Sequence, residues 1–137
     1  MVRKIVLWGL VLSLLSVVFG AFGAHALKQW VTAEKIAIFE TGVRYQFMHA
    51  VALLLLAIYC QQVVPFPIIE KTLLWVSRFF ILGILFFSGS LYLLTFQSLC
   101  SFNYTRIIGP FTPLGGLFFM IGWGAWIRWA WLYKVDK

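Results

Sequence analysis

Residues 5–24 read IVLWGLVLSLLSVVFGAFGA, a run of twenty residues without a charge that decides the fold. Arg3 and Lys4 precede the run. A helix of about 20 mostly apolar residues is long enough to cross the hydrocarbon core of a bilayer. A helix also satisfies its own backbone hydrogen bonds, which lipid cannot do for it. The run therefore predicts a membrane-spanning helix.

Three further apolar runs have the same character. They cover residues 47–64, 79–96 and 113–130, and Pro65 and Pro67 end the first of the three. The joins between the four runs are too short to hold a second folded unit. The sequence therefore predicts an all-α integral membrane protein, with one membrane domain over residues 1–137 that forms a bundle of four transmembrane helices.

The composition agrees with a protein embedded in lipid. Of the 137 residues, 63% are hydrophobic, 19% are aromatic and 11% are charged, whereas soluble domains average about 25% charged residues. This balance excludes a soluble enzyme, a disordered tail and a disulfide-stapled secreted module. The net charge of +7 comes from basic residues spread singly between apolar runs. That spread indicates contact with anionic lipid headgroups and no nucleic-acid partner.

A cleavable signal peptide is the alternative interpretation of the first run. Arg3 and Lys4, the apolar stretch and then Ala24-His25-Ala26 imitate the three parts of such a signal. The apolar core of a signal peptide usually has about 7–15 residues, and this run is longer. We therefore expect the run to be retained as the first span.

The distribution of Lys and Arg predicts the orientation. Four spans place both chain ends on one side of the membrane, and cytoplasmic loops carry the excess of basic residues. Both termini are therefore predicted to be cytoplasmic. The side of the termini carries seven basic residues, Arg3, Lys4, Lys71, Arg78, Arg128, Lys134 and Lys137, and the other side carries four, Lys28, Lys35, Arg44 and Arg106.

The segment between the first two spans predicts a short interfacial helix over residues 32–46. Thr32 can cap its N-terminus, and Phe39 and Val43 lie four residues apart on one apolar stripe. We expect this amphipathic helix to lie on the membrane surface and to bend into the second span near Gly42.

Small residues inside the spans predict close contacts between helices. Gly83 and Ser90 lie seven residues apart in the third span, and Gly115 and Gly122 lie seven apart in the fourth. Small residues at helical spacing let two helix backbones approach closely in lipid.

Polar residues that would meet near the outer leaflet form the candidate site. Glu40 and Arg44 lie four residues apart, as do Tyr45 and His49, so each pair shares one face of a helix. The first span ends, and the second and fourth begin, at the same membrane surface, and the third span runs toward it. The predicted cluster is His25, Glu40, Arg44, Tyr45, Gln46, His49, Ser88, Ser90 and Thr112.

Two interpretations of this cluster stay open. It can be a neutral hydrogen-bonded network that locks the helices together. It can also bind a lipid or a small amphiphile, with Arg44 and Arg106 in contact with a headgroup phosphate. Thr112 can in addition cap the fourth helix, with Pro113 as its first helical residue.

The sequence offers little for other chemistry. The ligand spacing typical of a metal site is missing, and no nucleophile, base and orienting group fall together. We therefore expect a non-enzymatic membrane component without a cofactor. The alternative is a small proton-linked transporter or channel subunit that uses Glu40 and His49, since imidazole changes charge near neutral pH. Besides membrane lipids, a second copy of the chain or another membrane protein is a candidate partner.

Four motifs, taken together, resemble one family. In this combination and order they are similar to the YgdD-like or YwdK-like proteins, small bacterial inner-membrane proteins of unknown function. The resemblance covers nearly the whole chain and implies a multi-pass, four-helix protein of the inner (plasma) membrane that keeps its first span. It implies no activity, substrate or catalytic residue. The motifs are GAFGAHAL at residues 20–27, FETGVRYQFMHA at 39–50, FSGSLY at 87–92 and GPFTPLGG at 109–116.

Overall fold

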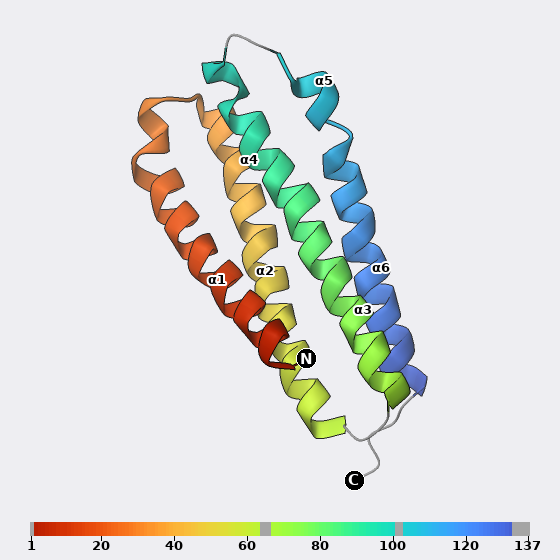
Figure 1. Ribbon diagram of the computed structural model, residues 1–137. Helices are drawn as coiled ribbons and strands as arrows, with labels where there is room; N and C mark the ends of the chain where they lie inside the picture. Colours follow the sequence, from red (N-terminus) through yellow and green to blue (C-terminus); the bar gives the residue numbers. More distant parts are fainter. Residues whose placement is uncertain (1, 64–66, 101–102, 133–137) are drawn as a thin grey trace.

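Four long helical segments make up the computed structural model, which describes residues 2–63, 67–100 and 103–132 (Figure 1). Three of them are single helices: α1 (Val2–His25), α2 (Ala33–Val63) and α6 (Phe111–Leu132). The other is the third segment along the chain and is built from three pieces. All four are long and apolar enough to cross a membrane, so the predicted four-span helical fold is confirmed.

The third span combines two kinds of helix. α3 (Pro67–Gly83) continues through the π-helical η2 (Ile84–Ser88) into α4 (Gly89–Phe96). A π-helical turn takes up an extra residue inside an α-helix and is found mostly as a single turn, often at functional sites. The helical winding therefore changes between Ser88 and Gly89, inside the motif at residues 87–92.

Short helical turns form the described parts of two connections. The 3-10 turn η1 (Leu27–Gln29) joins α1 to α2. After α4, the 3-10 turn η3 (Gln97–Leu99) and the short helix α5 (Thr105–Ile108) lead toward α6. Both connections lie at the same end of the molecule (Figure 1), which is the end predicted to hold the polar cluster.

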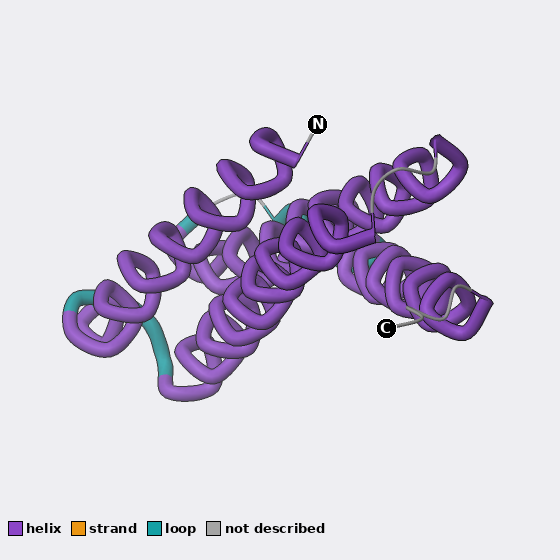
Figure 2. The backbone as a smooth tube through the Cα atoms, turned by 90° about the horizontal axis from the view of Figure 1, so that it is seen from below, coloured by secondary structure: helices purple, strands orange, loops and turns teal. Residues whose placement is uncertain are grey.

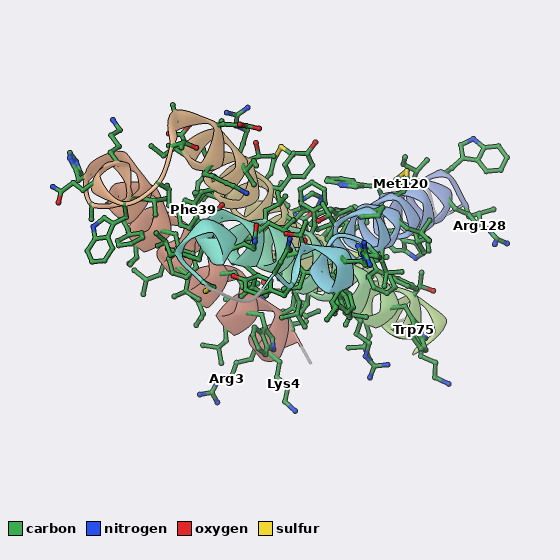
Figure 3. All side chains as sticks on the ribbon, turned by 90° about the horizontal axis from the view of Figure 1, so that it is seen from above. Arg3, Lys4, Phe39, Trp75, Met120 and Arg128 are labelled. Carbon is green, nitrogen blue, oxygen red and sulfur yellow. The ribbon has the colours of Figure 1, made fainter. Side chains whose placement is uncertain are left out.

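The helices are arranged as two antiparallel pairs that meet in the middle. α1 packs chiefly against α2, and α6 packs chiefly against α3 and η2. Contacts of α2 with α3, η2 and α4 join the two pairs. α1 and α6 therefore form the two flanks of the molecule (Figures 1 and 3). Figure 2 shows the same helices from below. Both flanking helices expose apolar side chains such as Leu14 and Ile127 on the outside of the molecule.

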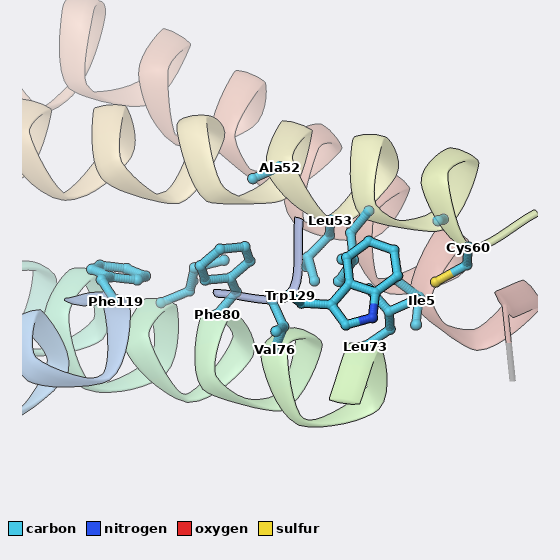
Figure 4. Close-up of a cluster of buried hydrophobic side chains, with 12 residues drawn as sticks. Ile5, Ala52, Leu53, Cys60, Leu73, Val76, Phe80, Phe119 and Trp129 are labelled. Atoms are coloured by element: carbon cyan, nitrogen blue, oxygen red, sulfur yellow. The ribbon is translucent and has the colours of Figure 1, made fainter. Parts of the chain in front are cut away.

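The apolar core lies where α2, α3 and α6 meet (Figure 4). Its side chains are at most 5% exposed, and tight packing of this kind is what holds helices together in lipid. Gly122 lets α6 approach α3, because a Cβ at this position would lie 2.7 Å from Cε1 of Phe80. The core residues include Ile5, Leu53, Leu56, Cys60, Leu73, Val76, Phe80, Phe119 and Trp129.

α2 corrects one expectation about the second span. Residues 33–46 are helical, and the Lys35 N–H donates to the Thr32 side-chain oxygen across 3.5 Å as the predicted cap. The predicted bend near Gly42 is wrong, because α2 runs unbroken over its 31 residues, about 46 Å. Gly42 is buried, and a Cβ there would lie 2.8 Å from the ring of Tyr92. The glycine therefore serves close packing against α4, and a continuous helix keeps its backbone bonded in lipid.

Candidate functional site

The structure divides the predicted polar cluster among separate places. Glu40 and Arg44 line an open groove between α1 and α2. Gln46 and His49 are buried inside the molecule, while Ser90 meets Thr112 between α4 and α6. His25 stays exposed at the C-terminal end of α1. The cluster is therefore a set of distinct contacts rather than one continuous site.

The groove exists because α1 presents small residues to α2. Gly20 has no side chain to fill the space, and a Cβ there would still lie 3.7 Å from Val43, whereas Gly23 packs closely against Phe39, whose ring would lie 3.0 Å from a Cβ. Glu40 and Arg44 are both exposed along this groove. The groove has a volume of about 430 Å³ and is lined by Ser16, Val17, Gly20, Gly23, Phe39, Glu40, Val43, Arg44 and Phe47.

The two charged groups of the groove do not neutralise each other. Their spacing of four residues, with the acid first, favours an ion pair on a helix. Among the residues that the structure describes, however, no ion pair joins Glu40 to Arg44. A carboxylate and a guanidinium thus stand one helical turn apart with their charges available to a ligand.

His49 belongs to an aromatic cage inside the molecule. Its ring stacks on Phe119 with centroids 3.5 Å apart, and Phe80 contacts it edge-on at 5.4 Å. The Trp123 indole N–H donates to Nε2 of His49 across 3.1 Å. Because indole nitrogen can only donate, Nε2 is the acceptor and the ring proton is on Nδ1. Nδ1–H then donates to the Tyr45 carbonyl oxygen at 2.8 Å.

Gln46 ties three helices together. Its Nε2 donates to the Leu12 carbonyl oxygen of α1 across 3.0 Å, and its Oε1 accepts from the Tyr92 hydroxyl of α4 across 2.9 Å. The Ser16 hydroxyl donates to the same Leu12 oxygen at 2.8 Å. Both polar ends of the buried amide are therefore satisfied, as a membrane interior requires.

Ser90 and Thr112 form a second contact between helices. Their hydroxyls lie 2.7 Å apart, and the Ser90 hydroxyl also donates to the Phe87 carbonyl oxygen at 2.8 Å. Thr112 does not cap the fourth helix as predicted, because α6 begins at Phe111 and Thr112 lies inside its first turn. Its hydroxyl instead bonds Ser90 across the helix interface.

Ser88 and Tyr45 hold the remaining positions of the predicted cluster. Ser88 lies at the end of η2, fully buried, and its hydroxyl has no hydrogen-bond partner among the described residues. The ring of Tyr45 packs at a tilt of 38° against Phe87, with centroids 4.6 Å apart. Both residues thus contribute to the joint between α2 and the third span.

Arg106 is separate from the groove. It is exposed on α5, and α5 packs against α4. The groove between α1 and α2 has Arg44 as its cation. The two predicted headgroup contacts, Arg44 and Arg106, therefore belong to different surfaces.

Four residues that make these contacts were not singled out in the predicted cluster. Tyr92 and Ser16 satisfy Gln46 and its acceptor, and Trp123 fixes His49. The Lys35 ammonium donates to the Leu94 carbonyl oxygen at 3.0 Å and anchors the start of α2 to α4. Tyr92 lies two residues after Ser90 in the motif at residues 87–92, so the sequence offered a signal for it. The contact between Trp123 and His49 depends on how α6 is rotated against α2, which the sequence does not give.

The site has limited chemistry of its own. Among the described residues, no three of His, Cys, Asp and Glu come together to hold a metal ion. The hydrogen-bonded contacts of Gln46, His49 and Ser90 are neutral, which suits them to locking helices. The groove differs, because it combines unpaired opposite charges with an apolar lining on the outside of the molecule.

Comparison with known proteins shows that the chain matches a family of membrane proteins. Residues 19–116 match the model of a family described as "Protein of unknown function (DUF423)". The chain is 33% identical over 121 residues to a UPF0382 membrane protein of Staphylococcus saprophyticus, covering 88% of this chain and 91% of that protein. It is 35% identical over 121 residues to the UPF0382 inner membrane protein YgdD of Escherichia coli K12, covering 88% and 84% of the two chains. No solved structure matches the chain.

Proposed function

The chain belongs to the DUF423 family of membrane proteins of unknown function, and from this premise we propose that it binds a phospholipid or similar amphiphile in the groove between α1 and α2. In this proposal it acts as a binding component of the inner membrane rather than as an enzyme. One observation carries the proposal. Arg44 is exposed in a groove beside small residues, with no ion pair to Glu40.

The depth of Arg44 supports a lipid as the ligand. Arg44 follows Lys35 by nine residues on one unbroken helix, about 13 Å along its axis. Charged side chains at this depth are expensive in a bilayer and mark functional positions. A guanidinium binds phosphate through two parallel hydrogen bonds. A headgroup phosphate drawn into the groove would therefore offset the expense of placing Arg44 there.

The same proposal gives the groove an orientation. Arg3 and Lys4 lie at the start of α1 and Arg128 lies near the end of α6, and both of these helix ends are at the lower end of the molecule in Figure 1. By the bias of basic residues toward the cytoplasm, this end is the cytoplasmic one. The groove then opens into the outer leaflet, and Arg106 forms a second, separate headgroup contact at the same face.

The transport alternative finds no supporting observation. A proton relay would need Glu40 and His49 to exchange protons. Glu40 lines the outward groove, whereas both ring nitrogens of His49 are already hydrogen-bonded inside the aromatic cage. We therefore retain lipid binding as the proposed function.

Lipid co-purification tests the proposal. The protein is extracted in mild detergent, and the phospholipid bound per chain is counted by native mass spectrometry. We expect Arg44→Ala to lose most of the bound phospholipid and Arg106→Ala to lose part of it. Arg78→Ala is the control, because Arg78 stacks over Trp75 at 5.1 Å on another helix. Unchanged lipid in the Arg44→Ala/Arg106→Ala double variant would refute the proposal.

A further inference from the structure

We propose that the groove selects a phospholipid whose headgroup ends in a primary ammonium, that is, an ethanolamine-type aminophospholipid. This inference rests on the proposed function and names its ligand class. Arg44 binds the phosphate, and Glu40 binds the ammonium. Three features of the groove support this assignment. Glu40 and Arg44 carry opposite charges, Glu40 precedes Arg44 along α2, and no ion pair joins these two side chains.

The order of the charges matches the order of groups in such a lipid. α2 begins at Ala33, at the end of the molecule that holds η1 and α5 (Figure 1). Glu40 precedes Arg44 by four residues, so it lies about 6 Å closer to that membrane face. In a zwitterionic phospholipid the phosphate lies next to the glycerol, and the ammonium extends outward from it. The deeper cation therefore meets the phosphate and the shallower anion meets the ammonium.

The carboxylate distinguishes this headgroup from other common ones. An anionic glycerol headgroup brings no cation to Glu40 and leaves the carboxylate unpaired. A trimethylated ammonium has no N–H to donate to the carboxylate and is typically held by an aromatic cage. Phe39 does not provide such a cage, because its ring is 2% exposed and packs on Tyr92 with centroids 4.8 Å apart. A primary ammonium offers three N–H donors to the carboxylate.

The rest of the groove suits the apolar part of the lipid. Val17, Val43 and Phe47 line it beside Arg44. The Ser16 hydroxyl already donates to the Leu12 oxygen, so its hydrogen is bonded and the side chain can lie beside an acyl chain. Glu40 and Arg44 thus lie next to an apolar surface. Their order along the groove matches the order of the ammonium, the phosphate and the acyl chains in a phospholipid.

The experiment uses the full chain in nanodiscs or detergent with lipids of identical acyl chains. Equal amounts of phosphatidylethanolamine, phosphatidylglycerol and phosphatidylcholine are offered, and the bound lipids are resolved by native mass spectrometry. We expect the wild type to enrich phosphatidylethanolamine about fivefold or more over the other two, as one added charge-assisted contact predicts. Glu40→Gln should abolish this preference while keeping total phospholipid. Glu34→Gln is the matched control, since Glu34 is exposed in the first turn of α2 outside the groove.

A charge exchange separates headgroup order from net charge. The double variant Glu40→Arg/Arg44→Glu keeps the composition of the groove but inverts the order of its charges. We expect this variant to fold, as shown by an unchanged helical circular dichroism spectrum, and to lose the ethanolamine preference.

The outcomes distinguish this inference from the proposed function. If Glu40→Gln or the exchanged pair still prefers phosphatidylethanolamine, the headgroup assignment is overturned while lipid binding at Arg44 stands. If Arg44→Gln keeps all of its phospholipid, the proposed function fails together with the inference. Loss of the preference in Glu34→Gln as well would also overturn the assignment, because the effect would then follow the charge of the chain rather than the groove.

Discussion

Gly115 of α6 lies so close to the backbone of Phe87 in the π-helical turn that no Cβ fits between the two residues. An added methyl group must therefore push α6 away from the third span. We expect Gly115→Ala to destabilise the protein by about 1–3 kcal/mol, the usual range for overpacking a close contact. Unfolding in mixed micelles with increasing SDS measures the change in the free energy of unfolding.

Gly124 on the same helix provides the control for this prediction. A Cβ at Gly124 meets nothing within 4 Å, and the residue is exposed. Gly124→Ala should be neutral or stabilising by up to about 1 kcal/mol, because alanine has the higher helix propensity. Equal effects of the two substitutions would show that the approach of α6 to Phe87 does not determine stability.

The bond between Trp123 and His49 predicts a measurable coupling. His49→Phe keeps a ring against Phe119 but leaves the indole N–H of Trp123 without its acceptor, so we expect a loss of about 1–2 kcal/mol. Trp123→Phe should also destabilise, because it leaves Nε2 of His49 unpaired. In the double variant the two effects should be non-additive by about 0.5–1.5 kcal/mol, within the range measured between membrane helices. Strict additivity would contradict a structural role for this bond.

Much of the fold is predictable from the sequence because the bilayer enforces it. A run such as residues 5–24 has few alternatives to a spanning helix, since lipid leaves the backbone to bond itself. Close packing at Gly122 is likewise predicted by its seven-residue spacing from Gly115. The bend near Gly42 is wrongly predicted, because glycine has two physical uses. It can loosen a helix, or it can admit a neighbour such as Tyr92, and only the packing distinguishes them.

The sequence predicts which polar residues lie near one another along the chain, but not how the fold groups them. Gln46 and His49 follow Arg44 closely along the chain. Whether a helical residue faces a groove or the core depends on the rotation of α2 against α1, α4 and α6. That rotation places Arg44 in the groove and His49 in the aromatic cage. It also brings in Trp123, 74 residues away from His49 in the chain.

The bridge from Tyr92 to Gln46 predicts the effect of removing one hydroxyl. Tyr92→Phe leaves Oε1 of the buried Gln46 amide without its donor, and we expect a loss of about 1 kcal/mol, as for other hydrogen bonds between membrane helices. Tyr59→Phe is the matched control, because the Tyr59 ring packs on Trp129 at 4.5 Å and its hydroxyl has no hydrogen bond to the described residues. A loss of similar size in both variants, measured by SDS unfolding, would count against the bridge.

The orientation can be tested with the native cysteines. Cys100 is exposed beyond the end of α4, at the groove end of the molecule, while Cys60 is buried near the other end. If both termini are cytoplasmic, a membrane-impermeant maleimide should label Cys100 in intact spheroplasts without lysis. Cys100→Ser should abolish this labelling, and Cys60→Ser should leave it unchanged. Labelling of Cys100 that requires inverted membrane vesicles would place the termini outside the cytoplasm and move the groove to the inner leaflet.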